Sequence, residues 1–128
     1  MGVRLEFLTN LNITSVRGEN TRRLLDQFVV KYDGYYIVVP RGFETDYASI
    51  PKFVPRFIVD QDDAIIREAA VIHDYLYSRI SGTQLTRHTA DTILYYGMLA
   101  LGSPRWKAEL VHLAVRLFGW LFYKKDKL

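Results

Sequence analysis

The sequence predicts an α+β fold, in which a small antiparallel β-sheet packs on a unit of three helices. Residues 1–60 contain short alternating or β-branched runs separated by turn residues, whereas residues 62–123 contain apolar residues at helical spacing. The 128 residues are 49% hydrophobic and 24% charged, which is typical of a globular chain of one domain. We therefore expect a single domain over residues 1–128, with strands and loop in its first half and three helices in its second.

The first half opens with a predicted strand at Val3–Leu8, where apolar and polar residues alternate. The polar stretch Leu11–Arg23 predicts a loop, with Ile13 as the place where a further short strand fits. The later segment Arg41–Pro55 contains several residues that interrupt helices and strands, so it is predicted to form a long loop. A loop of this length in a compact domain is usually functional or tightly packed.

A β-hairpin is predicted between these two loop segments. Gln27–Tyr32 and Tyr35–Val39 are rich in β-branched and aromatic residues, and the pair Asp33-Gly34 separates them. This dipeptide favours a two-residue turn whose twist matches that of the flanking strands.

Three helices follow, with expected bounds of Asp63–Arg79, Thr86–Leu101 and Ser103–Tyr123. Thr86 is a good N-cap, and Gly102 is a good residue to end the second helix. Ser103 and Pro104 suit the cap and the first position of the third. Its apolar part, Leu110–Tyr123, predicts a buried core helix, with a partner-docking or membrane-surface helix as the alternative.

His73 and Asp91 are the polar residues that helical geometry directs inward. At about 100° per residue, His73 falls near the middle of the apolar arc of the first helix, with Asp74 at its edge. Asp91 lies at the margin of the apolar face of the second helix. The short loop between these helices predicts an antiparallel pair, which brings His73 and Asp91 to similar depths. We therefore expect the two side chains to meet.

Two interpretations of this pair remain open. It is a hydrogen-bonded core histidine that pins two helices, or a carboxylate–imidazole pair for metal binding or acid–base catalysis. The loop adds polar residues, so that a Ser49–His73–Asp91 triad can also be written. The candidate catalytic residues are His73, Asp91 and Asp46. A divalent metal (Zn, Mn, Mg or Fe) would use Asp46, His73, Asp74 and Asp91. The predicted polar cluster adds Thr45, Ser49 and Tyr77.

Composition excludes several kinds of site. The chain has no cysteine, so it forms no disulfide and has no thiolate metal ligand. Its net charge of +3 is scattered, so we expect no nucleic-acid partner. No apolar run reaches the roughly 20 residues that cross a bilayer, and the first residues lack the apolar stretch of a signal peptide.

Two motifs resemble a known family. The motif GFETDYASIP at Gly42–Pro51 and the motif AAVIHDYLY at Ala69–Tyr77 are together similar to the phage and prophage family called domain of unknown function 1353. The resemblance extends over about residues 35–122 and takes in Ala90-Asp91 and, near the end, Ala114-Val115-Arg116 with Gly119. The family's hallmark positions fall on Thr45, Asp46, Ser49, Pro51, His73, Asp74, Tyr77 and Asp91.

The resemblance implies a small phage-encoded protein, often encoded among structural genes. We therefore expect a virion-associated or assembly protein of the tail or baseplate, which acts through contacts with other phage structural proteins. It would be located in the virion, or in the host cytoplasm during assembly, and it could form an oligomer. The alternative is a small metal-dependent hydrolase of cell-wall or phosphodiester bonds. An inhibitor of a host defence protein is a third possibility. Asp46 and His73 should be close together if the polar cluster is shared.

Overall fold

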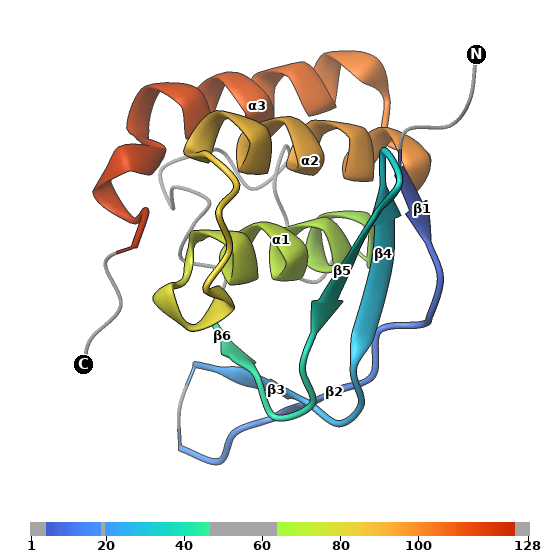
Figure 1. Ribbon diagram of the computed structural model, residues 1–128, viewed down its shortest axis with the longest axis vertical. Coiled ribbons are helices and arrows are strands. Elements are labelled where there is room, and N and C mark those ends of the chain that lie inside the picture. Colours follow the sequence, from blue (N-terminus) through green and yellow to red (C-terminus); the bar gives the residue numbers. More distant parts are fainter. Residues whose placement is uncertain (1–4, 19, 47–63, 125–128) are drawn as a thin grey trace. The chain divides into compact units, whose positions relative to one another are not determined.

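The computed structural model describes residues 5–18, 20–46 and 64–124, and the side chains of Ala64 and Ile65 are not described (Figure 1). The chain divides into two compact units, Met1–Asp46 and Tyr47–Leu128, and each is described by itself. The first unit contains strands and the second contains helices, so the predicted α+β class is confirmed. The packing of the sheet on the helices and the assignment of one domain stay predictions.

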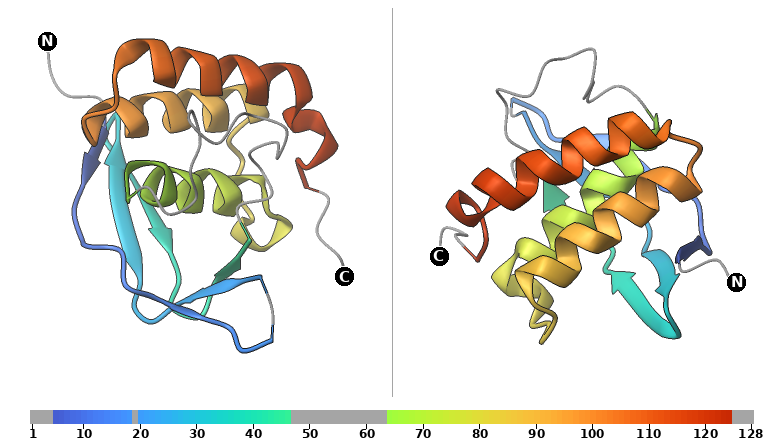
Figure 2. Two further views of the ribbon diagram at one scale, coloured as in Figure 1. Left: turned by 180° about the vertical axis from the view of Figure 1, so that it is seen from behind. Right: turned by 90° about the horizontal axis from the view of Figure 1, so that it is seen from above.

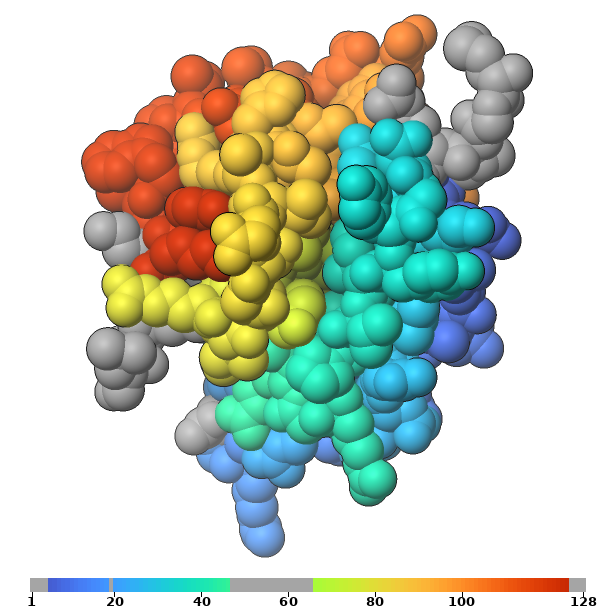
Figure 3. Space-filling model, viewed as in Figure 1, coloured from blue at the N-terminus to red at the C-terminus, as the bar shows by residue number. Residues whose placement is uncertain are grey.

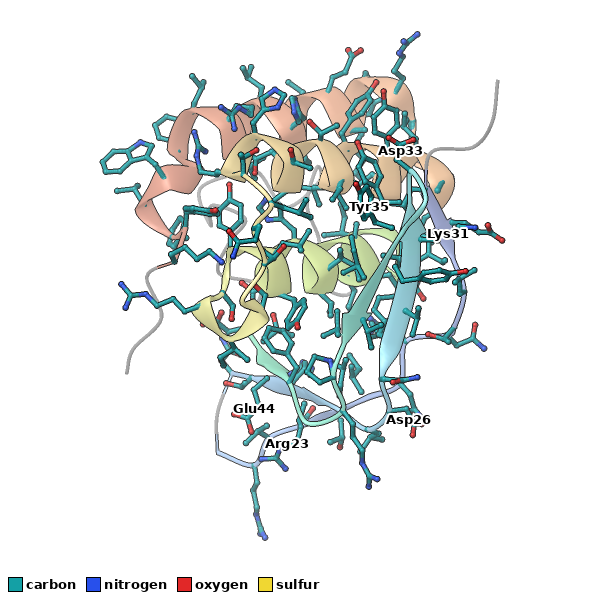
Figure 4. The ribbon with its side chains drawn as sticks, viewed as in Figure 1. Arg23, Asp26, Lys31, Asp33, Tyr35 and Glu44 are labelled. Carbon is teal, nitrogen blue, oxygen red and sulfur yellow. The ribbon has the colours of Figure 1, made fainter. Side chains whose placement is uncertain are left out.

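The predicted hairpin is present and forms the larger part of one sheet. Strands β4 (Phe28–Tyr32) and β5 (Tyr35–Val39) pair antiparallel, and β1 (Leu5–Phe7) pairs with the other edge of β4. The turn residues Asp33 and Gly34 have φ of 48° and 87°, the left-handed conformation that such a turn requires. Figure 4 labels three side chains around this turn, Lys31, Asp33 and Tyr35.

A second sheet lies where the sequence predicted mainly loop. Strands β2 (Ile13–Ser15), β3 (Arg22–Leu24) and β6 (Glu44–Thr45) pair antiparallel in the order β2-β3-β6. Strand β2 lies where a short strand at Ile13 was predicted, whereas β3 begins inside the predicted loop Leu11–Arg23, so the loop is wrong at that end. These strands have two or three mostly polar residues, of which Leu24 and Thr45 are buried. Arg23 and Glu44 form an exposed cross-strand ion pair with a nitrogen–oxygen distance of 2.8 Å (Figure 4).

The second unit is built on three helices, α1 (Ala64–Tyr77), α2 (Arg87–Ala100) and α3 (Arg105–Phe118). Helix α2 packs against both α1 and α3, and Figure 2 shows α2 and α3 side by side in both views. The short helices η1 (Arg79–Ser81) and η2 (Gly119–Leu121) follow α1 and α3.

The predicted ends of the first two helices hold within a residue or two, whereas the third helix needs a correction at each end. Helix α3 ends at Phe118, five residues before the predicted Tyr123, because the chain tightens into η2 at Gly119. The Thr86 hydroxyl accepts a hydrogen bond from the Thr89 backbone N–H at 3.1 Å, so the predicted N-cap is present. Gly102 adopts φ of 96° and ends α2 as expected. Pro104, rather than Ser103, is the N-cap of α3, and no side chain caps that end.

Only one face of α3 belongs to the core, so the prediction of a buried core helix is wrong for the other. Ala108, Val111 and Val115 are fully buried. The opposite side, which we call the α3 outer face, is exposed over Trp106, Leu110, Leu113 and Leu117. His112 and Arg116 lie on one side of the helix and apolar residues cover most of the rest, so the sequence could not show which apolar side would find a partner within the chain. No helix in the described ranges is long and apolar enough to cross a membrane.

Candidate functional site

The carboxylate of Asp91 is the centre of a hydrogen-bonded cluster. The His73 Nε2 atom lies 2.7 Å and the Tyr77 hydroxyl 2.5 Å from Asp91 Oδ1. The other oxygen, Oδ2, accepts from Arg116 Nη1 at 2.8 Å and from Arg87 Nη1 at 3.4 Å. We call these five residues the Asp91 cluster.

The Asp91 cluster joins all three helices. His73 and Tyr77 are four residues apart on α1, and Arg87 and Asp91 are four residues apart on α2, so each pair lies on one helix face. Arg116 reaches Asp91 from α3. One carboxylate therefore fixes the relative position of the three helices.

Arg87 makes a second connection, at the C-terminal end of α3. Its Nη1 and Nη2 atoms donate to the backbone carbonyls of Val115 and Arg116, at 2.9 and 3.3 Å. The Val115 carbonyl also accepts from the Gly119 backbone N–H, so Arg87 adds a second donor there. A cation at this end of a helix also interacts favourably with the helix dipole. Arg87 thus stabilises the end of α3 as well as the charge of Asp91.

Tyr77 is enclosed by aromatic and backbone contacts. Its ring centroid lies 4.1 Å from that of His73 and 5.1 Å from that of Tyr123, which meets it edge-on. A Cβ atom on Gly119 would lie 2.5 Å from the Tyr77 hydroxyl, so only glycine leaves room for this ring. The Lys124 backbone N–H donates to the Tyr77 carbonyl at 2.7 Å. The chain after α3 therefore closes over the end of α1.

The charges of the cluster are fixed by burial and by hydrogen bonding. Burial acts to raise the pKa of Asp91, but the hydrogen bonds and charge of His73, with the bonds from Tyr77 and Arg116, outweigh it and lower the pKa below its usual value. Burial, together with the bond to Asp91 and its charge, raises the pKa of Tyr77. At neutral pH Asp91 is therefore ionised and Tyr77 is a proton donor.

Raising the pH above about 10 should destabilise the protein partly through Tyr77. Because the pKa of Tyr77 is raised on folding, the folded state holds this proton more tightly than the unfolded state. That contribution is complete below the unfolded pKa and is lost as the pH rises towards the folded pKa. The Tyr77→Phe variant should therefore lose stability less steeply than the wild type between about pH 10 and pH 12, measured by urea unfolding. Tyr35→Phe, at an exposed tyrosine, should keep the wild-type slope. Equal slopes for all three proteins would contradict this assignment.

The His73–Asp91 pair is suited chemically to either a catalytic or a structural role, and the burial of both side chains distinguishes between the two. A carboxylate bonded to an imidazole is the arrangement that orients a histidine for proton transfer. Such a histidine must reach its substrate, whereas the side chains of His73 and Asp91 are both 0% exposed. A buried carboxylate with donors from three helices is well suited to holding those helices together.

The structure brings some of the predicted site residues together. His73 and Asp91 meet as expected, and Tyr77 joins them. Thr45 is buried on β6 and Asp46 is exposed beside it, both in the first unit, so their proximity to His73 stays a prediction. Ser49 and Pro51 lie outside the described residues, as does most of the predicted long loop. The catalytic roles of His73, Asp91 and Asp46 also stay predictions.

The predicted metal site also stays a prediction. Asp74 is half-buried on α1. Within the described ranges, three or more His, Cys, Asp or Glu side chains do not gather in a group that could hold an ion.

The sequence assigned no role to Arg87, and it indicated Gly119 only through the family resemblance. Arg116 was indicated by that resemblance and by its position one turn from His112, as a candidate polar seam on the third helix. The signal for Arg87 was its spacing of four residues from Asp91 on one helix, which favours an ion pair. The contact of Arg116 depends on how α3 packs on α2, which local spacing does not determine.

Comparison with known proteins gives one family and two relatives. A family model described as protein of unknown function (DUF1353) matches residues 22–115. The uncharacterized protein y4jT of Sinorhizobium fredii is 38% identical over 81 residues, which are 63% of this chain and 23% of that protein. The uncharacterized protein y4iH of the same organism is 33% identical over 116 residues, which are 88% of this chain and 47% of that protein. The chain thus spans less than half the length of either relative. No solved structure matches it.

Proposed function

The chain belongs to the DUF1353 family, and from this premise and the surface of α3 we propose that it is a virion-associated or assembly protein of a phage or prophage. In this role it binds a structural protein of the particle through the α3 outer face. The phage context comes from the resemblance of its two motifs, and the mode of action comes from the exposed surface.

The exposed apolar surface of α3 is the observation that carries this proposal. Trp106 is 53% exposed, Leu113 is 52% exposed and Leu117 is 55% exposed, and all three lie on one side of the helix. Trp120, just beyond α3, adds a further 59% exposed side chain. Contiguous apolar surface of this kind on a soluble protein marks a site of interaction. Tryptophan and leucine anchors on a helix are a common way to bind another protein.

The Asp91 cluster supports the same role by making this surface rigid. Arg116 binds Asp91 from α3, and Arg87 holds the carbonyls at the end of that helix. On the inner side, Val111 and Val115 anchor α3 in the core. A preformed surface loses little conformational freedom on binding, which favours affinity. Figure 3 shows α2, α3 and the chain after α3 forming one continuous surface.

The test is the protein content of the particle. A strain that carries the native phage or prophage without this gene is complemented with the wild type, with Leu113→Glu or with Leu25→Glu. We expect wild-type peptides in purified particles or tail intermediates by quantitative mass spectrometry. Leu113→Glu should be depleted by roughly tenfold, because burying an unpaired charge at an interface costs several kcal/mol.

The control Leu25→Glu places the same charge at a similarly exposed leucine of the first unit, which is 42% exposed. It should be incorporated like the wild type. Normal yields of particles and intermediates that never contain the wild-type chain would rule out the proposal.

A further inference from the structure

Strand β5 lies at the edge of its sheet, which has the order β1-β4-β5 (Figure 1). We call the side of β5 that faces away from β4 the β5 edge. The five residues of β5, Tyr35–Val39, include no charged residue, no proline and no bulge. Proteins use these devices to keep an edge strand from pairing with another chain. Among the residues that the structure describes, none pairs its backbone with the β5 edge. The β5 edge is therefore suited to pairing with a further strand.

The backbone of β5 presents hydrogen-bonding groups to this edge at two positions. The Leu8 N–H donates to the Val29 carbonyl at 2.9 Å and the Thr9 hydroxyl accepts from the Val29 N–H at 3.0 Å, so the backbone of Val29 faces β1. Val38 lies opposite Val29 and therefore directs its own N–H and C=O away from β4. These directions alternate along a strand, so Tyr36 does the same. Tyr36 and Val38 each offer one donor and one acceptor at the β5 edge.

The side chains of the same two residues make the adjoining surface apolar. Ile37 and Val39 are buried on the inner face of the sheet. Because side chains alternate along a strand, Tyr36 and Val38 point to the outer face, where they are 65% and 42% exposed. An exposed apolar face that ends at an unpaired strand is typical of a surface that another chain covers.

We propose that β5 pairs antiparallel with β5 of a second copy of this chain, so that two sheets of three strands join into one of six. Ile37 of one copy lies opposite Ile37 of the other, and Tyr36 of each copy lies opposite Val38 of the other. Each pair of Tyr36 and Val38 exchanges two backbone hydrogen bonds. The twofold axis is perpendicular to the sheet, so the outer faces are continuous and each contact occurs twice. This inference goes beyond the proposed function, because it uses a different surface and a different partner.

The residues at the two ends of β5 select this register. A shift by two residues in one direction places Tyr36 opposite Pro40, which has no N–H to donate. The same shift in the other direction places Val38 opposite Gly34, which lies in the hairpin turn. A shift by one residue sets outward groups against groups that already bond to β4. The proposed register is therefore the one that pairs the outward groups of both Tyr36 and Val38.

The charges near β5 are compatible with a second copy. Lys31 lies opposite Glu6 of β1, and its Nζ atom is 5.5 Å from the centre of the Tyr36 ring. In the six-stranded sheet the two Lys31 residues are three strand spacings apart, about 14 Å, which exceeds the screening length of about 8 Å at physiological salt. Tyr36 beside Val38 is an aromatic–β-branched pair of the kind that stabilises antiparallel strands. The β5 edge is therefore complementary to itself, which assigns a second copy as its occupant.

The small size of this contact sets the expected strength of the dimer. One strand edge with two exposed side chains buries a few hundred Å² per copy, roughly half of the 800 Å² per partner of a standard interface. We therefore expect a reversible dimer with a dissociation constant on the order of 100 µM.

Sedimentation equilibrium of the full chain from ~10 µM to ~1 mM covers this constant. The wild type should move from the 14.9 kDa monomer towards twice that mass. Val38→Pro removes an N–H that makes no bond to β4, at an edge position where proline is tolerated. It should weaken the dimer by roughly tenfold, because two of the intermolecular hydrogen bonds are lost. Circular dichroism verifies that this variant is folded. A wild type that stays monomeric at ~1 mM would overturn the proposal.

Charged variants provide a second measurement. Tyr36→Glu keeps a cross-strand partner for Lys31 within the monomer, but it brings two carboxylates to neighbouring positions across the twofold axis. It should weaken the dimer by roughly fivefold. Leu8→Glu places the same charge at an exposed leucine beside the far edge of the sheet and should dimerise like the wild type. Leu113→Glu, on α3, should also dimerise like the wild type. If Leu113→Glu alone were monomeric, α3 rather than β5 would carry the association and the proposal would be wrong.

Cysteine cross-linking tests the register, and the absence of native cysteines leaves no background. Tyr36→Cys and Val38→Cys proteins are oxidised separately and as a mixture. In the proposed register the Cα atoms of positions 36 and 38 lie about 5.5 Å apart, within reach of a disulfide, whereas identical positions lie about 9 Å apart. The mixture should therefore cross-link roughly tenfold more than either protein alone. Cross-linking of each protein with itself to the same extent would indicate a parallel or shifted pair and overturn the proposal.

Discussion

Replacing Asp91 with alanine should lower the free energy of unfolding by about 3–5 kcal/mol, the range for removing one partner of a buried ion pair. The carboxylate is 0% exposed and accepts hydrogen bonds from three helices. Without it, the hydroxyl of Tyr77 and the Nε2 atom of His73 lose their bonds to Asp91 in a site sealed from solvent. Arg87 and Arg116 can turn partly to water, because their side chains are 21% and 30% exposed. The largest part of the loss should therefore come from the α1 contacts.

Urea unfolding measures this change against two matched variants. Asp26→Ala removes an exposed carboxylate with one side-chain hydrogen bond, from Asn12, and should cost less than about 1 kcal/mol. Tyr77→Phe removes one donor of the Asp91 cluster and should cost about 1–2 kcal/mol, so it reports on the cluster in a chain that still folds. If Asp91→Ala were no more costly than Asp26→Ala, the cluster would not hold the three helices together.

The His73–Asp91 contact was predictable because it depends on local rules. Helical spacing sets the direction of each side chain, and the short connection from α1 to α2 makes the two helices antiparallel neighbours. The third helix obeys no such constraint, since the packing angle between α2 and α3 depends on side chains throughout the core. The contact between Arg116 and Asp91 was therefore not predicted. The outer face of α3 failed to be predicted for the same reason.

The short strands show a different limit of sequence reasoning. The hairpin of β4 and β5 has a turn dipeptide and two five-residue runs, so its signal is strong. By contrast, β2 and β6 have three and two residues and almost no apolar pattern. The pairing of β6 with β3 joins segments distant in the chain, and the Arg23–Glu44 pair is visible only once β3 and β6 are aligned. A period of two residues cannot be recognised in elements so short.

Replacing Gly119 with alanine should destabilise the protein by about 1–3 kcal/mol, the usual cost of overpacking a core. The backbone gives no reason for this loss. Gly119 has φ of −62° and ψ of −22°, which alanine adopts readily, and alanine would lower the entropy of the unfolded chain. The added Cβ would meet the Tyr77 hydroxyl at 2.5 Å and Arg87 Nη1 at 3.2 Å. Tyr77 cannot yield without lengthening its bond to Asp91.

A double-mutant cycle with Tyr77→Phe isolates this contact. Removing the hydroxyl relieves the closest approach, so the double variant should be more stable than the sum of the single losses by about 1 kcal/mol. Gly102→Ala is the matched control, because Gly102 has open space around it and a φ of 96°. Its cost comes from backbone strain alone and should add to that of Tyr77→Phe without coupling. Coupling for Gly102, or strict additivity for Gly119, would show that the close approach of the chain after α3 to Tyr77 does not limit this position.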